Sequence, residues 1–182
     1  MRKKLVAFIG AIGAGKSTAA SEFTNWTKQY QRIGFADPLK SMLMALGLTP
    51  VELYGNDKEK PSVLLSGKTP RYAMQKLGEE WGRQLISSEI WVNAWLHRVS
   101  CNTIGTVVDD LRYPNEYSAV RSLGGIIVKV VRHGCTTNSG HQSEMHFDNF
   151  NYDYILTNDN TPRYWERIRK LRKEIAEYSP EE

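Results

Sequence analysis

The chain has 182 residues, of which 41% are hydrophobic, and a formal net charge of +4. This is enough for one globular domain, and the sequence contains no repeat or low-complexity segment that would indicate a fibrous or disordered chain. No apolar stretch approaches the roughly 20 residues that cross a bilayer, and two cysteines without a secretory signal favour reduced thiols in the cytoplasm. We therefore expect a single domain over residues 1–182, with mobile segments at about 49–68 and 133–148 and no membrane partner.

The most specific pattern lies near the N-terminus. An apolar strand over residues 4–9 leads into Gly10-Ala-Ile-Gly-Ala-Gly-Lys-Ser17, the spacing of a phosphate-binding P-loop, and a helix is expected from Lys16 to about residue 28. Glycines let successive backbone N–H groups turn toward a phosphate, at the positive end of the helix. Lys16 is expected to reach the β- and γ-phosphates, and Ser17 to hold Mg²⁺. The predicted nucleotide-binding residues of this loop are Gly10, Ala11, Gly13, Ala14, Gly15, Lys16, Ser17 and Thr18.

A second strand over residues 31–35 and a helix over 38–46 complete a βαβα opening, which predicts a parallel sheet. Asp37 and Lys40 follow the second strand and are expected at the same edge as the P-loop. Asp37 also fits a helix cap, a role compatible with a functional one. The proline- and glycine-containing stretch from residue 49 to 68 is predicted as a loop that could carry a substrate lid.

A helix beginning at Pro70 is predicted to run through the mid-eighties, followed by another over about residues 90–99. Arg71 and Gln75 share one face at its start, where cations and N–H groups suit a monophosphate; solvated charges at a helix start are the alternative. Three tryptophans recur at helical spacing and are expected in a core rather than an interface: Trp81, Trp91 and Trp95. The sequence leaves open whether the chain forms a homodimer.

The next strand, over residues 105–110, ends in two acids and resembles a Walker B strand. Either Asp109 or Asp110 is expected to serve the metal, since ligands gather at the carboxyl ends of parallel strands. Arg112 is expected in the same cleft, or else in a surface ion pair. Arg132, which ends an apolar strand over residues 126–131, is a candidate lid arginine or simply a solvated strand end.

The C-terminal part is predicted as a helix over 115–123, a short strand over 154–157 and a closing helix from Arg163. Basic side chains gather on that last helix. They fit a solvated helix face better than a nucleic-acid surface, because glutamates dilute the charge.

Taken in order, these motifs resemble the phage-type deoxynucleoside monophosphate kinases of the P-loop kinase superfamily. The resemblance spans about residues 4–161 and includes Trp91-Val, Tyr113-Pro-Asn-Glu116 and His141-Gln-Ser-Glu144. It implies a three-layer α/β/α fold with a mostly parallel sheet and a small lid region. It also implies transfer of the γ-phosphoryl group of ATP, with Mg²⁺, to a small-molecule deoxynucleoside monophosphate, in the cytoplasm (the host's, for a phage gene).

The resemblance also implies roles for individual residues. Lys16, Asp109, Arg71 and Arg112 correspond to catalytic or transition-state groups, and Asp37, Lys40, Arg71 and Gln75 to the acceptor pocket. Arg132, His141 and Glu144 correspond to lid or acceptor contacts. Related kinases hold the adenine at the turn before the last helix, which places Asn158 among the nucleotide-binding candidates.

Two other functions remain open at this level. One is a P-loop kinase of a different small acceptor such as dephospho-coenzyme A, which shares the strand and P-loop at the start of the chain. The other, supported only by the basic C-terminal helix, is an ATPase that depends on nucleic acid.

Overall fold

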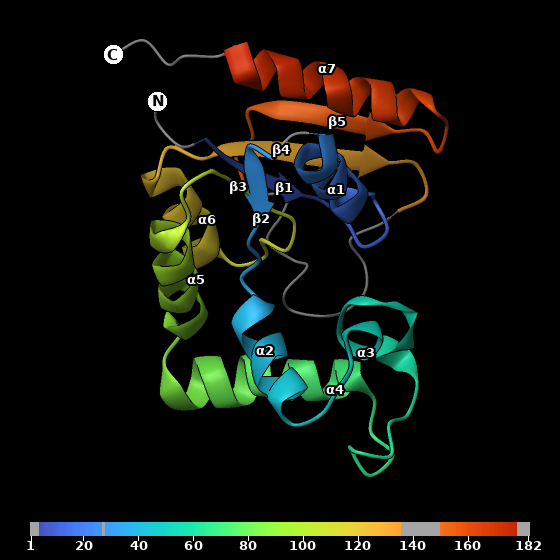
Figure 1. Ribbon diagram of the computed structural model, residues 1–182, viewed down its shortest axis with the longest axis vertical. Helices are drawn as coiled ribbons and strands as arrows, with labels where there is room; N and C mark the ends of the chain where they lie inside the picture. Colours follow the sequence, from blue (N-terminus) through green and yellow to red (C-terminus); the bar gives the residue numbers. More distant parts are fainter. Residues whose placement is uncertain (1–3, 27, 136–149, 178–182) are drawn as a thin grey trace. The chain divides into compact units, whose positions relative to one another are not determined.

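Five strands form one parallel sheet in the order β2-β3-β1-β4-β5 (Figure 1). The computed structural model describes residues 4–26, 28–135 and 150–177. Within them the strands are β1 (Leu5–Ile9), β2 (Tyr30–Arg32), β3 (Gly105–Val108), β4 (Ile126–Arg132) and β5 (Tyr154–Asn158). The chain divides into two compact units, a first one of residues 1–34 and 98–182 that contains the sheet, and a second one of residues 35–97.

Helices cover both faces of the sheet in the first unit. These helices are α1 (Lys16–Trp26), α6 (Pro114–Ser122) and α7 (Arg163–Glu177). Val6 and Phe8 of β1 belong to the core cluster that includes α1 and α7. Leu5 points to the other face, where a Cβ added at Gly125 would meet both Leu5 and Val120 of α6. Every residue of β1 is buried, as expected of a strand with both faces covered. The predicted three-layer fold with a parallel sheet is confirmed.

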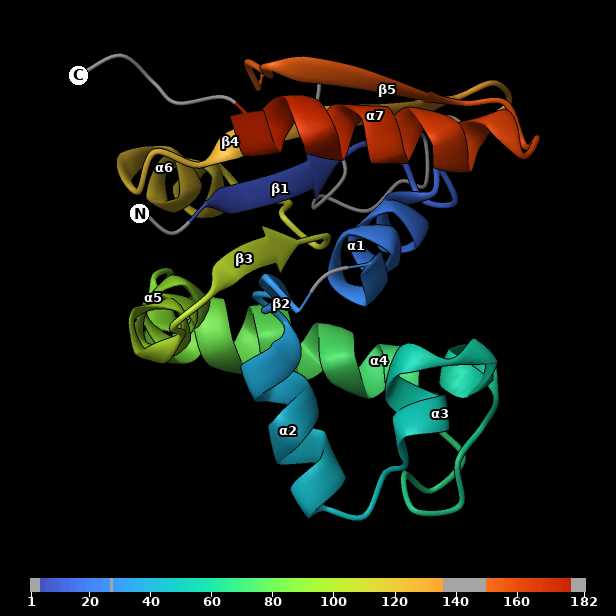
Figure 2. The same ribbon diagram turned by 45° about the horizontal axis from the view of Figure 1, so that its top comes forward.

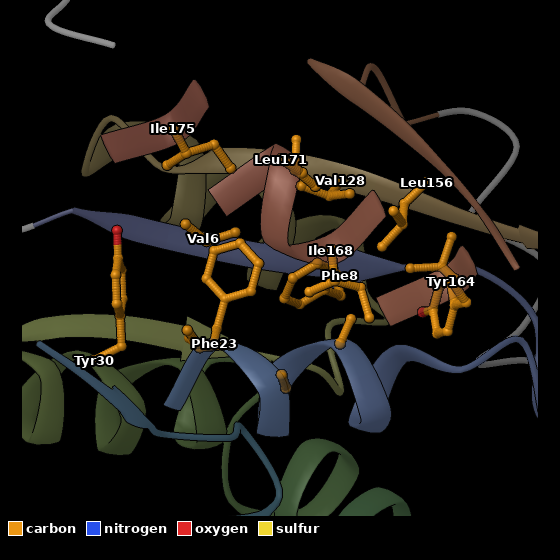
Figure 3. Close-up of a cluster of buried hydrophobic side chains, with 14 of the residues drawn as sticks. Val6, Phe8, Phe23, Tyr30, Val128, Leu156, Tyr164, Ile168, Leu171 and Ile175 are labelled. Atoms are coloured by element: carbon orange, nitrogen blue, oxygen red, sulfur yellow. The ribbon is translucent and has the colours of Figure 1, made fainter. Parts of the chain in front are cut away.

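Aromatic side chains occupy the centre of the core between the sheet and α1 (Figure 3). The rings of Phe8 and Phe23 meet edge to face with centroids 5.3 Å apart, and those of Phe23 and Tyr30 do so at 5.8 Å. Aliphatic residues of α7, among them Ile168 and Ile175, complete the cluster. Phe23 thus connects α1 with β1 and with the start of β2.

The second unit is helical. Its elements are α2 (Asp37–Ala45), α3 (Pro50–Tyr54), the 3₁₀ helix η1 (Asn56–Glu59), α4 (Pro70–Gln75), the π-helix η2 (Lys76–Ile86) and most of α5 (Ile90–Cys101). Buried leucines and Trp91 form its core. The tryptophans expected in a core are buried at Trp91 and Trp95, whereas Trp81 is 37% exposed.

The π-helix η2 continues α4 without a break and packs against Trp91. The Trp91 indole Nε1 donates to the carbonyl oxygen of Gly78 at 2.8 Å. A Cβ added at Gly82 would lie 2.5 Å from the indole ring of Trp91. Two glycines one turn apart therefore form the surface on which this tryptophan packs.

Two predictions of local structure were wrong or incomplete. The stretch from residue 49 to 68 contains α3 and η1 rather than loop alone, because Thr49 and Glu52 form a capping box at the start of α3. The helix from Pro70 changes to π geometry at Lys76. Among the described residues, none of the helices combines the length and the apolar character that a membrane span requires.

Replacing Phe23→Ala should lower the free energy of unfolding by about 3–5 kcal/mol, because it removes a fully buried ring and both edge-to-face contacts. Urea unfolding monitored by circular dichroism measures this loss. Phe23→Leu retains most of the buried volume and should cost less. Equal stability of the alanine variant and the wild type would contradict the assigned core.

Candidate functional site

In the loop between β1 and α1, residues 10–15, glycines adopt backbone conformations that a side chain at the same positions would not permit. Gly10 and Gly15 have φ angles of +135° and +105°, in a region that disfavours a Cβ. A Cβ at Gly10 would lie 2.3 Å from the carbonyl oxygen of Val130, and one at Gly15 would lie 2.5 Å from Nδ2 of Asn158. The loop therefore lies directly against β4 and the end of β5.

Lys16, the first residue of α1, reaches back across this loop. Its Nζ donates hydrogen bonds to the carbonyl oxygens of Gly10 at 2.7 Å and Ala11 at 2.8 Å. The N-terminal end of an α-helix adds partial positive charge at the same place. An ammonium group and a helix N-terminus beside a glycine-rich loop form a site that attracts phosphate.

Two buried side chains from the C-terminal part of the chain fasten the loop. Asn158, which ends β5, donates from Nδ2 to the carbonyl oxygen of Ala14 at 2.9 Å. Tyr164, on α7, donates its hydroxyl to the carbonyl oxygen of Gly15 at 2.9 Å. Burial raises the pKa of the Tyr164 hydroxyl well above its ordinary value, so that the group stays protonated and remains a donor.

A pocket of about 340 Å³ opens beside the loop, within the size range of small-molecule sites. Figure 2 shows that the end of β1, the start of α1 and the turn from β5 into α7 lie at one edge of the sheet. The lining comes from these segments and the end of β4: Gly13, Gly15, Lys16, Ser17, Thr18, Arg132, Asn158, Asn160, Tyr164 and Trp165. Arg132 also donates from Nη1 to the carbonyl oxygen of Gly13 at 3.0 Å.

The pocket thus brings together most of the nucleotide-binding residues predicted from the sequence, and Arg132 with them. Gly10, Ala11 and Ala14 belong to the loop but not to the lining. Asp109, Asp110 and Arg112 are likewise outside the described lining of this pocket.

The two acids after β3 lie beside Arg32, the last residue of β2. Arg32 Nε donates to Oδ1 of Asp109 at 2.7 Å, and Arg32 Nη2 lies 3.9 Å from Oδ2 of Asp110. In the part of the chain that the structure describes, no three His, Cys, Asp or Glu side chains gather as a metal site. Mg²⁺ commonly takes only one or two protein ligands and keeps several waters, so that Ser17 and one of these acids would suffice.

Arg112 lies in the connection between β3 and α6. Its backbone N–H donates to Oε2 of Glu116 at 2.7 Å, and that of Tyr113 donates to the same atom at 3.1 Å. Glu116 is buried and lies in the first turn of α6. This carboxylate orders the segment that carries Arg112.

In the second unit, Asp37 and Lys40 are brought together by Tyr54, which the sequence did not single out. The Tyr54 hydroxyl lies 3.5 Å from Oδ1 of Asp37, and Lys40 Nζ lies 4.1 Å from the centroid of the Tyr54 ring. The expectation that Asp37 caps α2 is wrong, because the N-cap residue is Ala36 and Asp37 is the first helical residue. Asp37 is buried, with 5% of its surface exposed.

Arg71 and Gln75 lie in α4, one turn apart as predicted. Thr69 caps this helix by accepting a hydrogen bond from the N–H of Tyr72 at 3.1 Å. Arg71 forms an ion pair with Glu59 of η1. Both side chains of this pair are more than a third exposed, so the pair contributes little to stability and Arg71 can exchange partners.

The candidates His141 and Glu144 lie outside the described residues, as does most of the segment over 133–148. Sequence reasoning missed Arg32, Tyr54, Tyr164 and Trp165, whereas Asn160 lies in the turn already named as the adenine-binding candidate. Arg32 and Tyr164 contact partners 77 and 149 positions away, which no local pattern reveals. Trp165 had a weak signal, since it recurs at helical spacing with the apolar residues Ile168, Leu171 and Ile175.

Three comparisons relate the chain to known proteins. The family model described as deoxynucleotide monophosphate kinase matches residues 58–167. A protein of Acanthamoeba polyphaga mimivirus, provisionally named a deoxynucleotide monophosphate kinase, is 29% identical, in an alignment that covers 86% of this chain and 89% of the viral protein.

Solved structures show the same fold at low identity. TT1252 from Thermus thermophilus has a TM-score of 0.53 and 15% identity, with 98% of this chain and 100% of that chain covered. Shikimate kinase from Bacteroides thetaiotaomicron has a TM-score of 0.52 and 12% identity, with 95% and 98% covered.

Replacing Tyr164→Phe removes the hydroxyl that donates to Gly15 and should lower the free energy of unfolding by about 1 kcal/mol at neutral pH. The difference from the wild type should narrow above pH 10. There the unfolded wild-type chain gains stability by ionising this tyrosine, whereas the folded state resists ionisation because its pKa is raised. Chemical unfolding of both proteins at neutral pH and above pH 10 measures their difference in free energy of unfolding at each pH. A stability advantage of the wild type that grows with pH would contradict the assignment.

Proposed function

Because the chain belongs to the deoxynucleotide monophosphate kinase family, we propose that it transfers the γ-phosphoryl group of ATP to a deoxynucleoside monophosphate. An oxygen of the acceptor phosphate forms a bond to the γ-phosphorus, and the bond from that phosphorus to the β,γ-bridging oxygen breaks. The products are a deoxynucleoside diphosphate and ADP. The observation that carries this proposal is the glycine loop with Lys16 across it, which lies beside a pocket in the size range of small-molecule sites.

The loop and Lys16 would bind the phosphates of the donor. In the structure the Lys16 ammonium contacts two carbonyl oxygens, and we propose that it turns to the β- and γ-phosphates when ATP enters. One such charge pair at about 4 Å and an effective dielectric near 20 contributes roughly 4 kcal/mol. Trp165 and Asn160 line the same pocket, and we assign the base of ATP to their side of it, near Asn158.

The residues at hand suit Mg²⁺, since the Ser17 hydroxyl and the acids after β3 offer hard oxygen ligands of the kind it prefers. When bound, Mg²⁺ neutralises charge on the phosphates. Ser17 and either Asp109 or Asp110 would hold it. Arg112 and Arg132 would add positive charge where the transferring group gathers negative charge.

We assign recognition of the acceptor to residues of the second unit. Lys40 and Arg71 supply cations, while Asp37 and Gln75 supply hydrogen-bonding groups for the base or the sugar. In the structure, Asp37 and Lys40 both contact Tyr54. Arg71 forms an ion pair with Glu59 of the same unit. An acceptor phosphate carries its own negative charge at neutral pH, so that positioning rather than a general base carries the reaction.

The proposal is tested by measuring ADP formation with ATP, Mg²⁺ and each deoxynucleoside monophosphate in turn. We expect turnover with at least one of them, and a loss of about a thousandfold in Lys16→Ala, which corresponds to roughly 4 kcal/mol of transition-state stabilisation. Circular dichroism should show that this variant keeps its fold.

The same assay is run with dephospho-coenzyme A and with DNA in place of the acceptor. Activity with dephospho-coenzyme A alone would replace the proposed acceptor, and activity that appears only with DNA would indicate a nucleic-acid-dependent ATPase. Normal turnover of Lys16→Ala would contradict the assignment of the loop itself.

Replacing Arg71→Ala should raise the KM for the deoxynucleotide roughly 10- to 100-fold, since a charged hydrogen bond to a phosphate contributes about 1.5–3 kcal/mol. The KM for ATP should change little. Steady-state kinetics with each substrate varied in turn separates the two constants.

Glu59→Gln provides the matched control for this variant. It removes the exposed ion-pair partner of Arg71 and should leave the KM for the deoxynucleotide near that of the wild type. A rise in the KM for ATP rather than for the acceptor in Arg71→Ala would move Arg71 out of the acceptor site.

A further inference from the structure

The carboxyl ends of β2 and β3 carry a cluster of three charged residues, which we call the Arg32 clamp: Arg32, Asp109 and Asp110. One guanidinium contacts both acids, through Nε to Asp109 at 2.7 Å and through Nη2 to Asp110 at 3.9 Å. The Asp109 side chain is 5% exposed and that of Asp110 is 16% exposed. Each acid is therefore largely shielded from water and held near the same cation.

The backbone around the clamp is arranged to leave room for it. Gly34 is buried, two residues after Arg32. A Cβ at this position would lie 2.6 Å from Oδ2 of Asp110 and 2.9 Å from Nη2 of Arg32. Both atoms are the ends of flexible side chains, so an alanine here would displace the carboxylate and the guanidinium rather than the sheet.

Arginine suits this position for a physical reason. Two neighbouring carboxylates repel each other, and a positive charge placed between them offsets the repulsion. The planar guanidinium presents several N–H donors in a fixed fork and can reach two acids at once, whereas a lysine ammonium acts as a single point charge. The strand pairing fixes the position of the Arg32 backbone relative to the end of β3, because Arg32 pairs with Val107 in the parallel ladder of β2 and β3.

We infer that Arg32 is a positioning residue for the metal-binding carboxylate of the phosphoryl-transfer site. It holds Asp109 and Asp110 in place, so that whichever of the two acids binds Mg²⁺ is already oriented when the nucleotide enters, and it does not itself contact the metal. The inference rests on the proposed function, because that function supplies the Mg²⁺–nucleotide complex. Groups that orient a metal ligand commonly change metal affinity or activity by 10- to 100-fold when they are removed.

The test compares Arg32→Gln, Arg32→Lys and Gly34→Ala with the wild type. The Mg²⁺ affinity of each ADP-bound protein is measured by calorimetry, and the affinity for ADP alone is measured in EDTA. We expect Mg²⁺ affinity to fall roughly 10- to 100-fold in all three variants, with metal-free ADP affinity unchanged. Gly34→Ala is informative even if Arg32→Gln fails to fold, because it keeps every charge and only shifts the clamp.

Arg121→Gln is the matched control. Arg121 has the same 29% side-chain exposure as Arg32 and pairs with Asp153 at 2.6 Å in the same unit. This variant should lose stability as Arg32→Gln does while keeping the Mg²⁺ affinity of the wild type. Wild-type Mg²⁺ affinity in Gly34→Ala and Arg32→Lys would overturn the inference, as would an equal loss of metal-free ADP affinity in those variants.

The outcomes also separate this inference from the proposed function. A wild-type protein that binds Mg²⁺ and ADP but phosphorylates no deoxynucleotide would contradict the proposed acceptor and leave the clamp measurements valid. A wild-type protein that forms deoxynucleoside diphosphates, with variants that bind Mg²⁺ normally, would overturn only the role of Arg32.

Discussion

The glycine loop keeps its shape because its carbonyl oxygens are taken up by side chains from four different elements. Lys16 of α1, Arg132 of β4, Asn158 of β5 and Tyr164 of α7 each donate to one or two of them. Glycine loses more conformational freedom on folding than any other residue, so a glycine-rich loop needs such contacts to keep one conformation. By binding the carbonyl oxygens, these donors hold the loop in one conformation, which the proposed phosphate site requires.

Much of the fold followed from local pattern. The apolar run at Leu5 to Ile9 and the acids after β3 stand out in the sequence because a parallel strand buried on both faces is continuously hydrophobic and ends at a polar edge. The helix at Pro50 was missed because its proline and the following Gly55 were interpreted as breakers. The local signal existed all the same, in Thr49 and Glu52.

The residues of the candidate site also fall into those that a local sequence pattern indicates and those that it does not. The loop residues and Arg71 were accessible to sequence reasoning because their chemistry depends on neighbours within one turn. Arg32 and Tyr54 were not, since their relevance comes from partners brought close only by folding. A side chain whose role is to hold another in place leaves no spacing of its own in the sequence.

The fastening of the loop by Tyr164 has a consequence for how the protein is made. The hydroxyl and the carbonyl oxygen that it binds belong to residues 149 positions apart. During synthesis the residues around Gly15 leave the ribosome long before α7 exists, at about 5–20 residues per second. The nascent chain therefore carries the complete P-loop sequence for seconds without the contacts from β4, β5 and α7 that shape it, and the proposed nucleotide site is completed as one of the last events of folding.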